Sequence, residues 1–278
     1  MLSLIERHIE SIDRELVLIA PPHAVLPDGF RNVSFEDERA SSAIRALQTL
    51  RGSIYVSEGN ISREQLTFDG RHQTPEDDQA WHVLMTDGRQ RVRSCALYLE
   101  HRDPTSVDDL RVRHCPLLQD AKWRPVLTGA VQSEIAKARQ DGLRYAELGG
   151  WAIEKERRGT PEALMMALAT YALSRMLGGA LGITTANVAH SCSSILRRFG
   201  GSHLEHDGVV IPAYFDQRYN TEIELLRFDY RAPSTRYARL IDVVQKKLAN
   251  VAVFARASNL TSLHSHFVRH VHQPLFAA

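Results

Sequence analysis

The feature that most constrains the fold is a strand, a basic turn and a helix that follow one another over residues 144–177. The apolar residues of 144–153 predict the strand, and the apolar run from 164 to 177 predicts the helix. Thr160 suits the helix N-cap, and Pro161 suits the first helical position because its missing N–H would be unpaired there. This order of elements is typical of an α/β protein.

The turn at residues 157–160 has the chemistry of an anion site. A helix N-terminus carries unpaired N–H groups and about half a positive charge, so it attracts anions. Gly159 lets the backbone come close to a ligand, and Arg157 and Arg158 add charged donors. The segment therefore predicts a phosphate site, although an ordinary well-capped connection between a strand and a helix explains the same residues.

Composition narrows the class of protein. The chain has 278 residues, of which 44 % are hydrophobic and 24 % charged, as in soluble globular proteins. A net charge of +1 gives no basis for a nucleic-acid partner, and no apolar run approaches the roughly 20 residues of a membrane-spanning helix. Cys95, Cys115 and Cys192 contain no CxxC pair, and the charged start is unlike a secretory signal. We therefore expect a cytoplasmic protein with reduced thiols and no transmembrane segment.

Helices and strands alternate along the rest of the chain. Apolar residues at helical spacing predict a helix over 1–16, which packs on its own domain or on a second subunit, so a dimer stays open. Residues 18–38 read as an extended connector. The expected order then is a helix at 37–51, strands at 80–85 and 91–99, a helix at 126–138, the strand and helix described above, a strand at 180–186, a helix at 191–198, strands at 209–214 and 223–228, and a helix at 234–256.

Glycines predict local features of three of these elements: a turn, a helix end and a bulge. Asp87-Gly88 between two strand-like runs predicts a type I′ hairpin turn. Gly142 is a suitable stop for the helix at 126–138. Gly149-Gly150 in the middle of a strand predicts a bulge or a close approach of another group to the backbone.

The order of elements and the basic turn together resemble the GNAT acyltransferase superfamily. Its phosphate-binding turn follows the pattern Gln/Arg-x-x-Gly-x-Gly/Ala, and the matching residues here are Arg158-Gly-Thr-Pro-Glu-Ala163. Pro161 replaces the central glycine and removes one N–H donor, while Glu162 brings a negative charge nearby. The resemblance implies a GNAT-type mixed central sheet flanked by helices, with extra N-terminal and C-terminal helices. It divides the chain into an N-terminal helix and connector, an acyltransferase domain and a helical extension, at residues 1–36, 37–230 and 231–278.

Within the superfamily, the chain resembles the branch of acyl-homoserine lactone synthases and long-chain N-acyl amino acid synthases. A lactone synthase strand reads roughly Glu-Ile-Ser-Arg-Phe-Ala-Val, and the strand here is Glu147-Leu-Gly-Gly-Trp-Ala-Ile153. Glu147 matches the functional glutamate and Trp151 the aromatic position. The early Arg-x-x-x-Phe pair of the family is similar to Arg51 with Tyr55, and its acidic loop is similar to the segment from Asp69 to Asp77-Asp78.

Two departures bear on the product. Gly150 stands where the lactone synthases carry an arginine, and Cys95-Ala-Leu97 lacks the arginine of the family's Gly-Cys-x-Arg-Leu. These losses argue against a homoserine lactone product and fit the amino acid synthases better, or another acceptor. The resemblance covers residues 40–230.

The resemblance implies an N-acyltransferase that moves an acyl group from a thioester to an amine. The donor is acyl-coenzyme A or an acyl-phosphopantetheine on an acyl carrier protein, and the altered phosphate turn favours a medium or long chain on the carrier protein. The acceptor is a small-molecule amine, such as an amino acid. Glu147 serves as base or orients the acceptor, and N–H groups around Trp151, Ala152 and Ile153 hold the thioester oxygen.

The remaining roles fall into two groups. Residues expected to hold the donor are Ile153, Arg157, Arg158, Gly159, Thr160, Ala163 and Asn187. Residues expected to hold the acceptor are Arg51, which would clamp a carboxylate, Tyr55 and Asp77. For Glu147 a structural carboxylate paired with an arginine remains an alternative, and for Arg51 and Tyr55 a surface pair at a helix end.

Other histidines and cysteines make weaker candidates. His190 as a proton donor to the leaving thiol competes with a capping or surface role, and Cys192 has no base placed beside it for a nucleophilic role. The histidines from His264 to His272 lack a cysteine or acidic partner, so we expect no metal. A different class of function also stays open, because Pro161 and the lack of the family's usual tyrosine in 195–199 are compatible with a catalytically inactive module that binds an acyl thioester as a sensor or scaffold.

Overall fold

A mixed sheet forms the centre of the molecule. The structure is a computed structural model, and it describes residues 9, 15–22, 24–101, 103, 106–188 and 192–259. Ten strands are joined in the order β10-β11-β6-β5-β4-β3-β1-β12-β2, with β7 also paired to β11. The strands are β1 (Leu16–Ile19), β2 (Val33–Phe35), β3 (Trp81–Thr86), β4 (Val92–His101), β5 (Arg144–Ile153), β6 (Ala180–Asn187), β7 (Ser202–His203), β10 (Tyr214–Asp216), β11 (Thr221–Asp229) and β12 (Ala252–Ala255), and a separate hairpin of β8 (Glu205–His206) and β9 (Val209–Val210).

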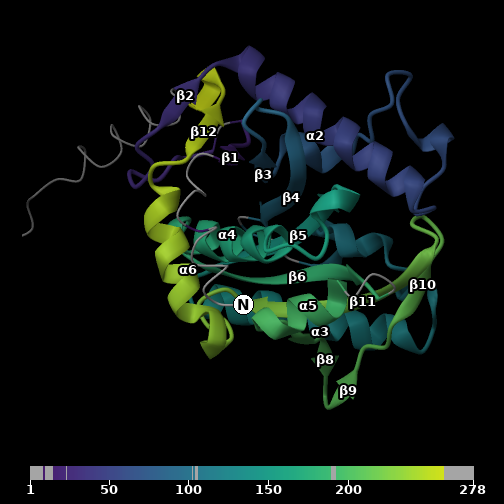
Figure 1. Cartoon of the computed structure of the whole chain (residues 1–278). Coiled ribbons are helices and arrows are strands. Elements are labelled where there is room, and N and C mark those ends of the chain that lie inside the picture. Colours follow the sequence, from purple (N-terminus) through teal and green to yellow (C-terminus); the bar gives the residue numbers. More distant parts are fainter. Residues whose placement is uncertain are drawn as a thin grey trace, which may run out of the picture.

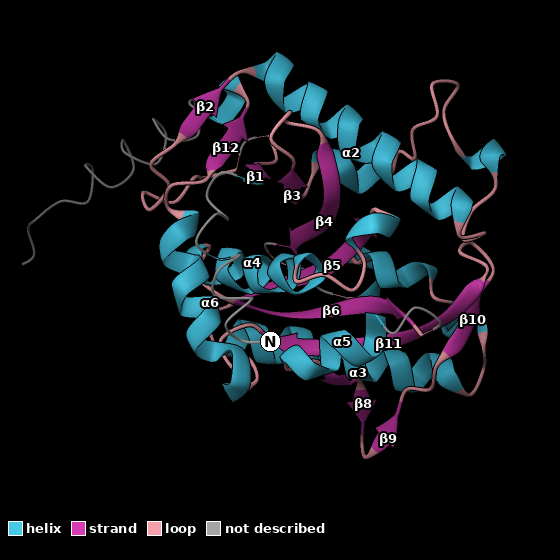
Figure 2. Ribbon diagram, in the orientation of Figure 1, coloured by secondary structure: helices cyan, strands magenta, loops and turns pink. Residues whose placement is uncertain are grey.

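Helices cover both faces of this sheet. Figure 1 shows α6 alongside α4, and Figure 2 shows the small β8–β9 hairpin projecting away from the main sheet. The helices are α2 (Asp37–Ser57), α3 (Trp123–Gln140), α4 (Glu162–Met176), α5 (Cys192–Phe199) and α6 (Thr235–Leu248), and the short 3-10 turns are η1 (Arg63–Gln65), η2 (Pro75–Asp78), η3 (Val107–Asp109), η4 (Arg111–His114), η5 (Pro116–Gln119) and η6 (Lys155–Arg157). The expected mixed central sheet flanked by helices is therefore confirmed.

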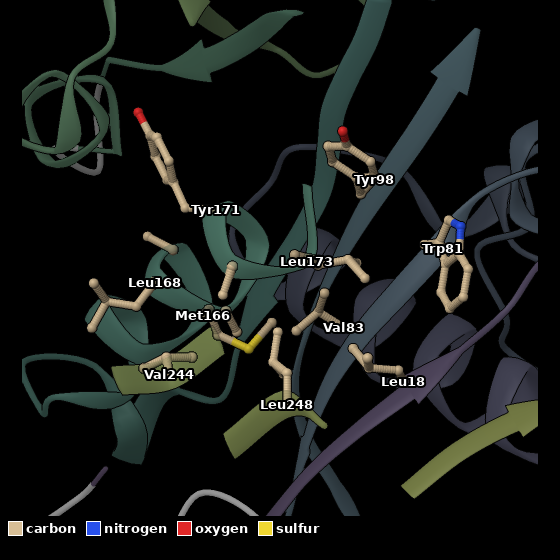
Figure 3. Close-up of a cluster of buried hydrophobic side chains, with 14 of the residues drawn as sticks. Leu18, Trp81, Val83, Tyr98, Met166, Leu168, Tyr171, Leu173, Val244 and Leu248 are labelled. Carbon is tan, nitrogen blue, oxygen red and sulfur yellow. The ribbon is translucent and has the colours of Figure 1, made fainter. Parts of the chain in front are cut away.

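The largest apolar core lies around α4, which is buried almost all round because it packs between the sheet and α6. Leu168 and Leu173 of α4 are fully buried there. Figure 3 shows α4 side chains between Val83 of β3 and Val244 of α6. Burial of each large aliphatic side chain contributes roughly 1.5–3 kcal/mol, so this layer is a major source of stability.

The helices α2 and α3 cover the other face of the sheet. Apolar residues of α2, such as Ile44 and Leu47, pack on β1, β3, β4, β12 and the far end of β5, whereas α3 packs on β6, β11 and the start of β5. The buried stripe of α2 continues through Arg51 and Ile54, which follow at helical spacing. A charged residue on an apolar stripe needs buried partners, and those partners lie beside the candidate site.

The expected C-terminal helix is present as α6, but both ends of the chain also add strands to the sheet. β1 and β2 come from the expected connector, and both pair in parallel with β12, which lies in the expected helix at 234–256. The single sheet thus includes strands from all three of the expected parts of the chain. The expected helix over 1–16 lies outside the described residues apart from Ile9, which is helical and buried, and residues 15 and 16.

Local details near three other elements also differ from expectation. The hairpin of β3 and β4 forms, but its turn is wider than type I′: Asp87 accepts from the backbone N–H of Arg89 and Arg91, and Gln90 takes the left-handed conformation with φ 60°. Helix α4 begins at Glu162, with Pro161 as its N-cap. The strand expected at 209–214 is divided between β9 and β10.

Candidate active site

An opening in the sheet forms where β5 and β6 separate. The two strands pair in parallel from Arg144 with Ala180 to Leu148 with Thr184, and the Thr184 hydroxyl donates to the Leu148 carbonyl at 2.8 Å. Beyond that point β5 continues along β4 to Ile153, while β6 continues along β11. The edge of β5 that faced β6 therefore loses its strand partner, which leaves backbone groups for a ligand.

The bulge expected at Gly149-Gly150 is confirmed. Cys95 pairs with Ala152 and Leu97 with Gly149, so β5 carries one extra residue at this point. Gly150 has φ +60°, and a Cβ there would lie 3.1 Å from the Leu97 Cβ. A larger residue at position 150 is disfavoured for two reasons: the positive φ favours glycine, and Leu97 and Arg51 leave little room for a Cβ atom. The extra residue also turns Ala152 toward α2, whereas Leu148 faces α4.

A large cavity of about 480 Å³ occupies the opening. It extends from the end of α2 to the start of α4 and to α5. Much of its lining is apolar, from Ile54, Leu148, Trp151, Ile153, Ile195, Leu196 and Ile223. Its polar lining includes Arg158, Gly159, Thr185 and Asn187.

A second, smaller cavity of about 220 Å³ adjoins the large one. The two share Arg111, Leu148, Thr184, Thr185 and Tyr219 in their linings. The lining of the small cavity is mostly polar and charged, and includes Gln73, Thr74, Glu76, Arg111, Arg113, His114, Glu147 and Arg218. An apolar space and a charged space therefore meet at the end of the β5–β6 pairing.

Glu147 lines the small cavity, and the residue is 4 % exposed. Its Oε2 accepts from the backbone N–H of Arg111 at 2.7 Å and bonds His101 Nε2 at 2.9 Å, and its Oε1 accepts from the backbone N–H of Val112 at 3.0 Å. The partners of the Glu147 carboxylate are thus backbone N–H groups and a histidine, and not the arginine side chain of the alternative interpretation. They fix the carboxylate and leave Oε1 capacity for one more donor.

Arg51 was expected to bind the carboxylate of an acceptor, but its guanidinium is buried and already bonded to Asp77. Its guanidinium is 2 % exposed and bonds both oxygens of Asp77, at 2.9 and 2.7 Å, and the ring and carbonyl of His72. Burial opposes both charges, but the Asp77 partner raises the pKa of Arg51, and Arg51 lowers that of Asp77. Neither residue lines either of the two cavities. The expected surface pair at a helix end is excluded as well.

Arg51 instead supports the bulge. A Cβ at Gly150 would lie 3.3 Å from its Nη1, so the guanidinium packs directly against this glycine. Breaking a buried ion pair by removing one partner costs about 3–5 kcal/mol. The Arg51–Asp77 pair is therefore part of the rigid frame that places β5.

Tyr55 and Trp151 both line the large cavity. The Tyr55 hydroxyl donates to the Trp151 carbonyl at 3.2 Å, which ties α2 to the strand just after the bulge. Burial raises the pKa of Tyr55, so the phenol stays protonated and can donate. The Tyr55 ring also meets the edge of Tyr219, with centroids 6.3 Å apart.

Part of the basic turn lines the large cavity. Arg158, Gly159 and Ala163 line the large cavity, but Arg157 and Thr160 do not. Arg158 pairs with Glu58 and donates to the Ile153 carbonyl, and Gly159 takes φ +74°. The Thr160 hydroxyl bonds the Arg157 carbonyl and accepts from the Glu162 N–H, so it organises the turn.

Glu162 does not place its charge in the cavity. The side chain is 6 % exposed and accepts from the Ser94 hydroxyl at 2.8 Å, with Arg157 at 3.4 Å. Burial raises the pKa of this carboxyl group. The negative charge of Glu162 would therefore not repel a phosphate bound in the cavity. Pro161 still supplies no N–H donor to such a phosphate.

Asn187 and Cys192 line the large cavity beside α5. The Asn187 side-chain oxygen accepts from the Thr221 hydroxyl at 3.2 Å. Burial raises the pKa of the Cys192 thiol to about 11, so little thiolate exists at neutral pH and a nucleophilic role is disfavoured. His190 and the histidines from His264 to His272 lie outside the described residues.

Arg111 and Tyr219 line both cavities, but neither was predicted from the sequence as a site residue. Arg111 lies in a stretch that looks polar and irregular in sequence, and Tyr219 in the turn between β10 and β11. Their only local signals are an arginine-rich run, Arg111-Val-Arg-His114, and an aromatic residue after Arg218. Long-range contacts, such as the bonds from η4 to Glu147, bring them to the site.

Comparison with solved structures finds proteins of similar fold. The coenzyme A-dependent acyl-homoserine lactone synthase BjaI, solved with MTA, superposes with a TM-score of 0.51 at 14 % identity, over 91 % of this chain and 99 % of that chain. The N-acyl amino acid synthase FeeM, from uncultured soil microbes, matches with a TM-score of 0.45 at 14 % identity, over 74 % of this chain and 94 % of that chain. No family model and no curated protein sequence matches the chain.

The match to BjaI shows that the chain shares the fold of this lactone synthase. The resemblance inferred from the Glu147 strand and the basic turn is thus confirmed at the level of the fold. Within the described ranges, no helix is long and apolar enough to span a membrane, and no three His, Cys, Asp or Glu side chains gather as metal ligands.

Proposed function

We propose that the protein is an N-acyltransferase that moves an acyl group from a thioester to a small-molecule amine. One observation carries the proposal: an apolar cavity and a charged cavity meet where β5 and β6 separate, and they share Arg111 and Tyr219. Such a reaction needs an apolar space for the acyl chain, a polar space for the amine and a passage between them.

The large cavity suits the donor. A phosphopantetheine arm is a chain of amides, which can bond the unpaired edge of β5, and its phosphate would meet Arg158 with the turn at Gly159 and Ala163. A medium or long acyl chain would contact Ile195, Leu196 and the other apolar lining residues. Coenzyme A and a carrier protein both supply this arm, and the inward turn of Glu162 removes one objection to coenzyme A.

The small cavity suits the acceptor amine. The amine nitrogen attacks the thioester carbonyl carbon, the new C–N bond replaces the C–S bond, and the electron pair of the broken bond leaves on sulfur. One proton from the amine passes to a base, and the thiolate gains one proton. Glu147 Oε1, with its spare acceptor capacity on the small cavity, is the candidate base.

Two further groups would act on the thioester. Backbone N–H groups from Trp151 to Ile153, next to the bulge, are the candidates for holding the oxygen as it gains negative charge. The hydroxyl of Tyr219, whose side chain lines both cavities, is the candidate proton donor to the departing sulfur. Asp77 and Arg51 position β5 in this scheme and do not touch a substrate.

The test is thiol release. The purified chain is mixed with decanoyl-coenzyme A, or with a decanoyl carrier protein, and with a panel of primary amines, and free thiol is followed with a colorimetric reagent. We expect amine-dependent release with at least one donor. Tight donor binding without release for any amine would favour the inactive sensor or scaffold instead, and absence of both would remove the thioester hypothesis.

A further inference from the structure

The end of α2 places a carboxylate in the large cavity. Glu58, the C-cap of α2, lines this cavity together with Arg158, and its side chain is 14 % exposed. Its Oε1 forms an ion pair with Arg158 Nη2, and its Oε2 accepts from the side-chain amide of Asn60 at 3.0 Å. Asn60 lines the same cavity. The arginine expected to bind the donor's phosphate therefore already binds an anion from its own chain.

The position of Glu58 is an unfavourable one for a negative charge. The C-terminus of a helix carries about half a negative charge, so a carboxylate there is destabilised. The last turn of α2, which lies wholly within the described residues, has no basic side chain to offset this effect. The carboxylate therefore depends on Arg158 and Asn60, which both lie outside the helix, for its favourable contacts.

Arg158 is fixed at the end of β5 and is still accessible to a ligand. Its Nε and Nη2 donate to the Ile153 carbonyl, both at 3.2 Å, which places the guanidinium beside the strand. The side chain is 39 % exposed and borders the cavity next to Gly159. An incoming phosphate can thus reach Arg158 without any change in β5, but it meets the Glu58 carboxylate there.

A phosphate and the Glu58 carboxylate repel each other if both lie at Arg158. Two like charges about 4 Å apart change an equilibrium constant by about five-fold even in water, and by more in a partly buried cavity. A phosphate monoester carries more than one negative charge near neutral pH, which strengthens the repulsion. The carboxylate must therefore leave Arg158 for a phosphate to bind there with full affinity.

We propose, on the basis of the donor site described above, that Glu58 competes with the donor's phosphate for Arg158 and Asn60. In the empty cavity the carboxylate accepts their hydrogen bonds, and when a phosphate binds, the phosphate accepts them instead and the carboxylate turns away. This exchange weakens the binding of the donor and of the thiol product alike, because both carry the same phosphate. Glu58 therefore sets the contribution of the phosphate to affinity and favours release of the product.

The test compares ligands that share one arm and differ in phosphate. Pantetheine has no phosphate, 4′-phosphopantetheine has a single phosphate, and coenzyme A has a pyrophosphate and a further phosphate. Isothermal titration calorimetry measures their binding to the wild type, to Glu58→Gln and to the matched control Glu156→Gln. Glu156 is an exposed carboxylate of η6, beside the same basic turn, and it does not line the large cavity.

We expect Glu58→Gln to bind 4′-phosphopantetheine and coenzyme A about five-fold more tightly than the wild type, or better. The affinity for pantetheine should not increase, because this ligand leaves the Glu58–Arg158 pair intact. Glu156→Gln should stay within about two-fold of the wild type, since its charge is exposed and screened. A purely structural role of Glu58 predicts the opposite sign, because loss of the ion pair would loosen the cavity and weaken binding.

The outcomes separate this inference from the proposed function. Equal or weaker binding of 4′-phosphopantetheine by Glu58→Gln overturns the competition at Arg158, even if the chain acylates amines. A gain that is as large for pantetheine overturns it too, because such a gain would not depend on the phosphate. Failure of every amine to release thiol overturns the acyltransferase, while the calorimetric comparison still decides whether Glu58 competes with a phosphate.

Discussion

Asp77 and Glu147 are two buried carboxylates that the structure uses in different ways. They are 2 % and 4 % exposed. Asp77 bonds Arg51, Gln48 and the Thr74 N–H, and its own side chain lines neither of the two cavities. Glu147 is held by backbone N–H groups and His101, and it lines the small cavity. A carboxylate enclosed by a cation stabilises the frame, whereas one fixed by backbone and open to a cavity can act on a ligand.

The largest effect expected from the difference between these two carboxylates is on the turnover rate. Glu147→Gln should lower kcat for thiol release by about 10²- to 10⁴-fold, since a general base contributes that much. KM for the acyl donor should stay within about two-fold, because Glu147 lines only the small cavity. Initial rates with decanoyl-coenzyme A at saturating amine provide the measurement.

A matched carboxylate makes this result specific. Glu134 of α3 is also largely buried and bonds Arg227 at 2.8 Å, and it lines neither of the two cavities. Glu134→Gln should keep the wild-type kcat. Equal rates for wild type and Glu147→Gln would show that Glu147 is not the base, and the proposed difference in role between Glu147 and Asp77 would then be wrong.

The next effect is on stability. Asp77→Ala should lower the free energy of unfolding by about 3–5 kcal/mol, because it leaves the buried Arg51 charge unpaired. Denaturant unfolding followed by circular dichroism measures this loss. The neighbouring Asp78 pairs with Arg256 while 68 % exposed, so Asp78→Ala should cost at most about 1 kcal/mol. Similar losses for both variants would contradict a structural role confined to Asp77.

A smaller effect on rate is expected at Tyr219. Removal of the hydroxyl in Tyr219→Phe should lower kcat by about 10- to 100-fold if it protonates the leaving sulfur, toward the low end for acid–base groups. The ring contacts with Tyr55 remain, so folding should be unaffected. A donor with a more acidic leaving thiol, such as a thiophenyl ester, should recover most of the loss. No such recovery would count against the proton-donor role.

The smallest expected effect is a dependence of stability on pH near Arg51. Burial first, and then the charge of Arg51, lower the pKa of His72 to about 4 from 6.5. Below pH 6.5 the unfolded chain binds a proton that the folded chain does not, so this contribution to stability is complete above pH 6.5 and falls between pH 6.5 and 4. Urea midpoints at pH 7 and pH 5 should differ less in His72→Gln than in the wild type.

The sequence is enough to predict the segment around the opening, and the reasons are local. The strand at 144–153 matches β5, and Gly149-Gly150 marks the bulge because a left-handed backbone requires glycine. The basic turn and the helix that follows were also predicted, because Thr160 and Pro161 are direct signals of a helix start.

Other parts depend on contacts between distant residues. β1 and β12 are short apolar runs close to Pro21 and Asn250, and they become strands because each completes the sheet for the other. Arg111 and Arg113 reach the site because Glu147 bonds the backbone of η4. The Arg51–Asp77 pair was assigned to the acceptor from a likeness in sequence, which does not reveal that each residue is buried against the other.

The central claim, transfer of an acyl group to an amine, is tested most directly by identifying the product. The chain is incubated with decanoyl-coenzyme A and a ¹⁵N-labelled amino acid, and the extract is analysed by mass spectrometry beside a thiol assay. The account predicts an N-decanoyl amino acid that carries the label and forms in equal amount to the free thiol. Decanoic acid as the sole acyl product, with or without the amine, would contradict it.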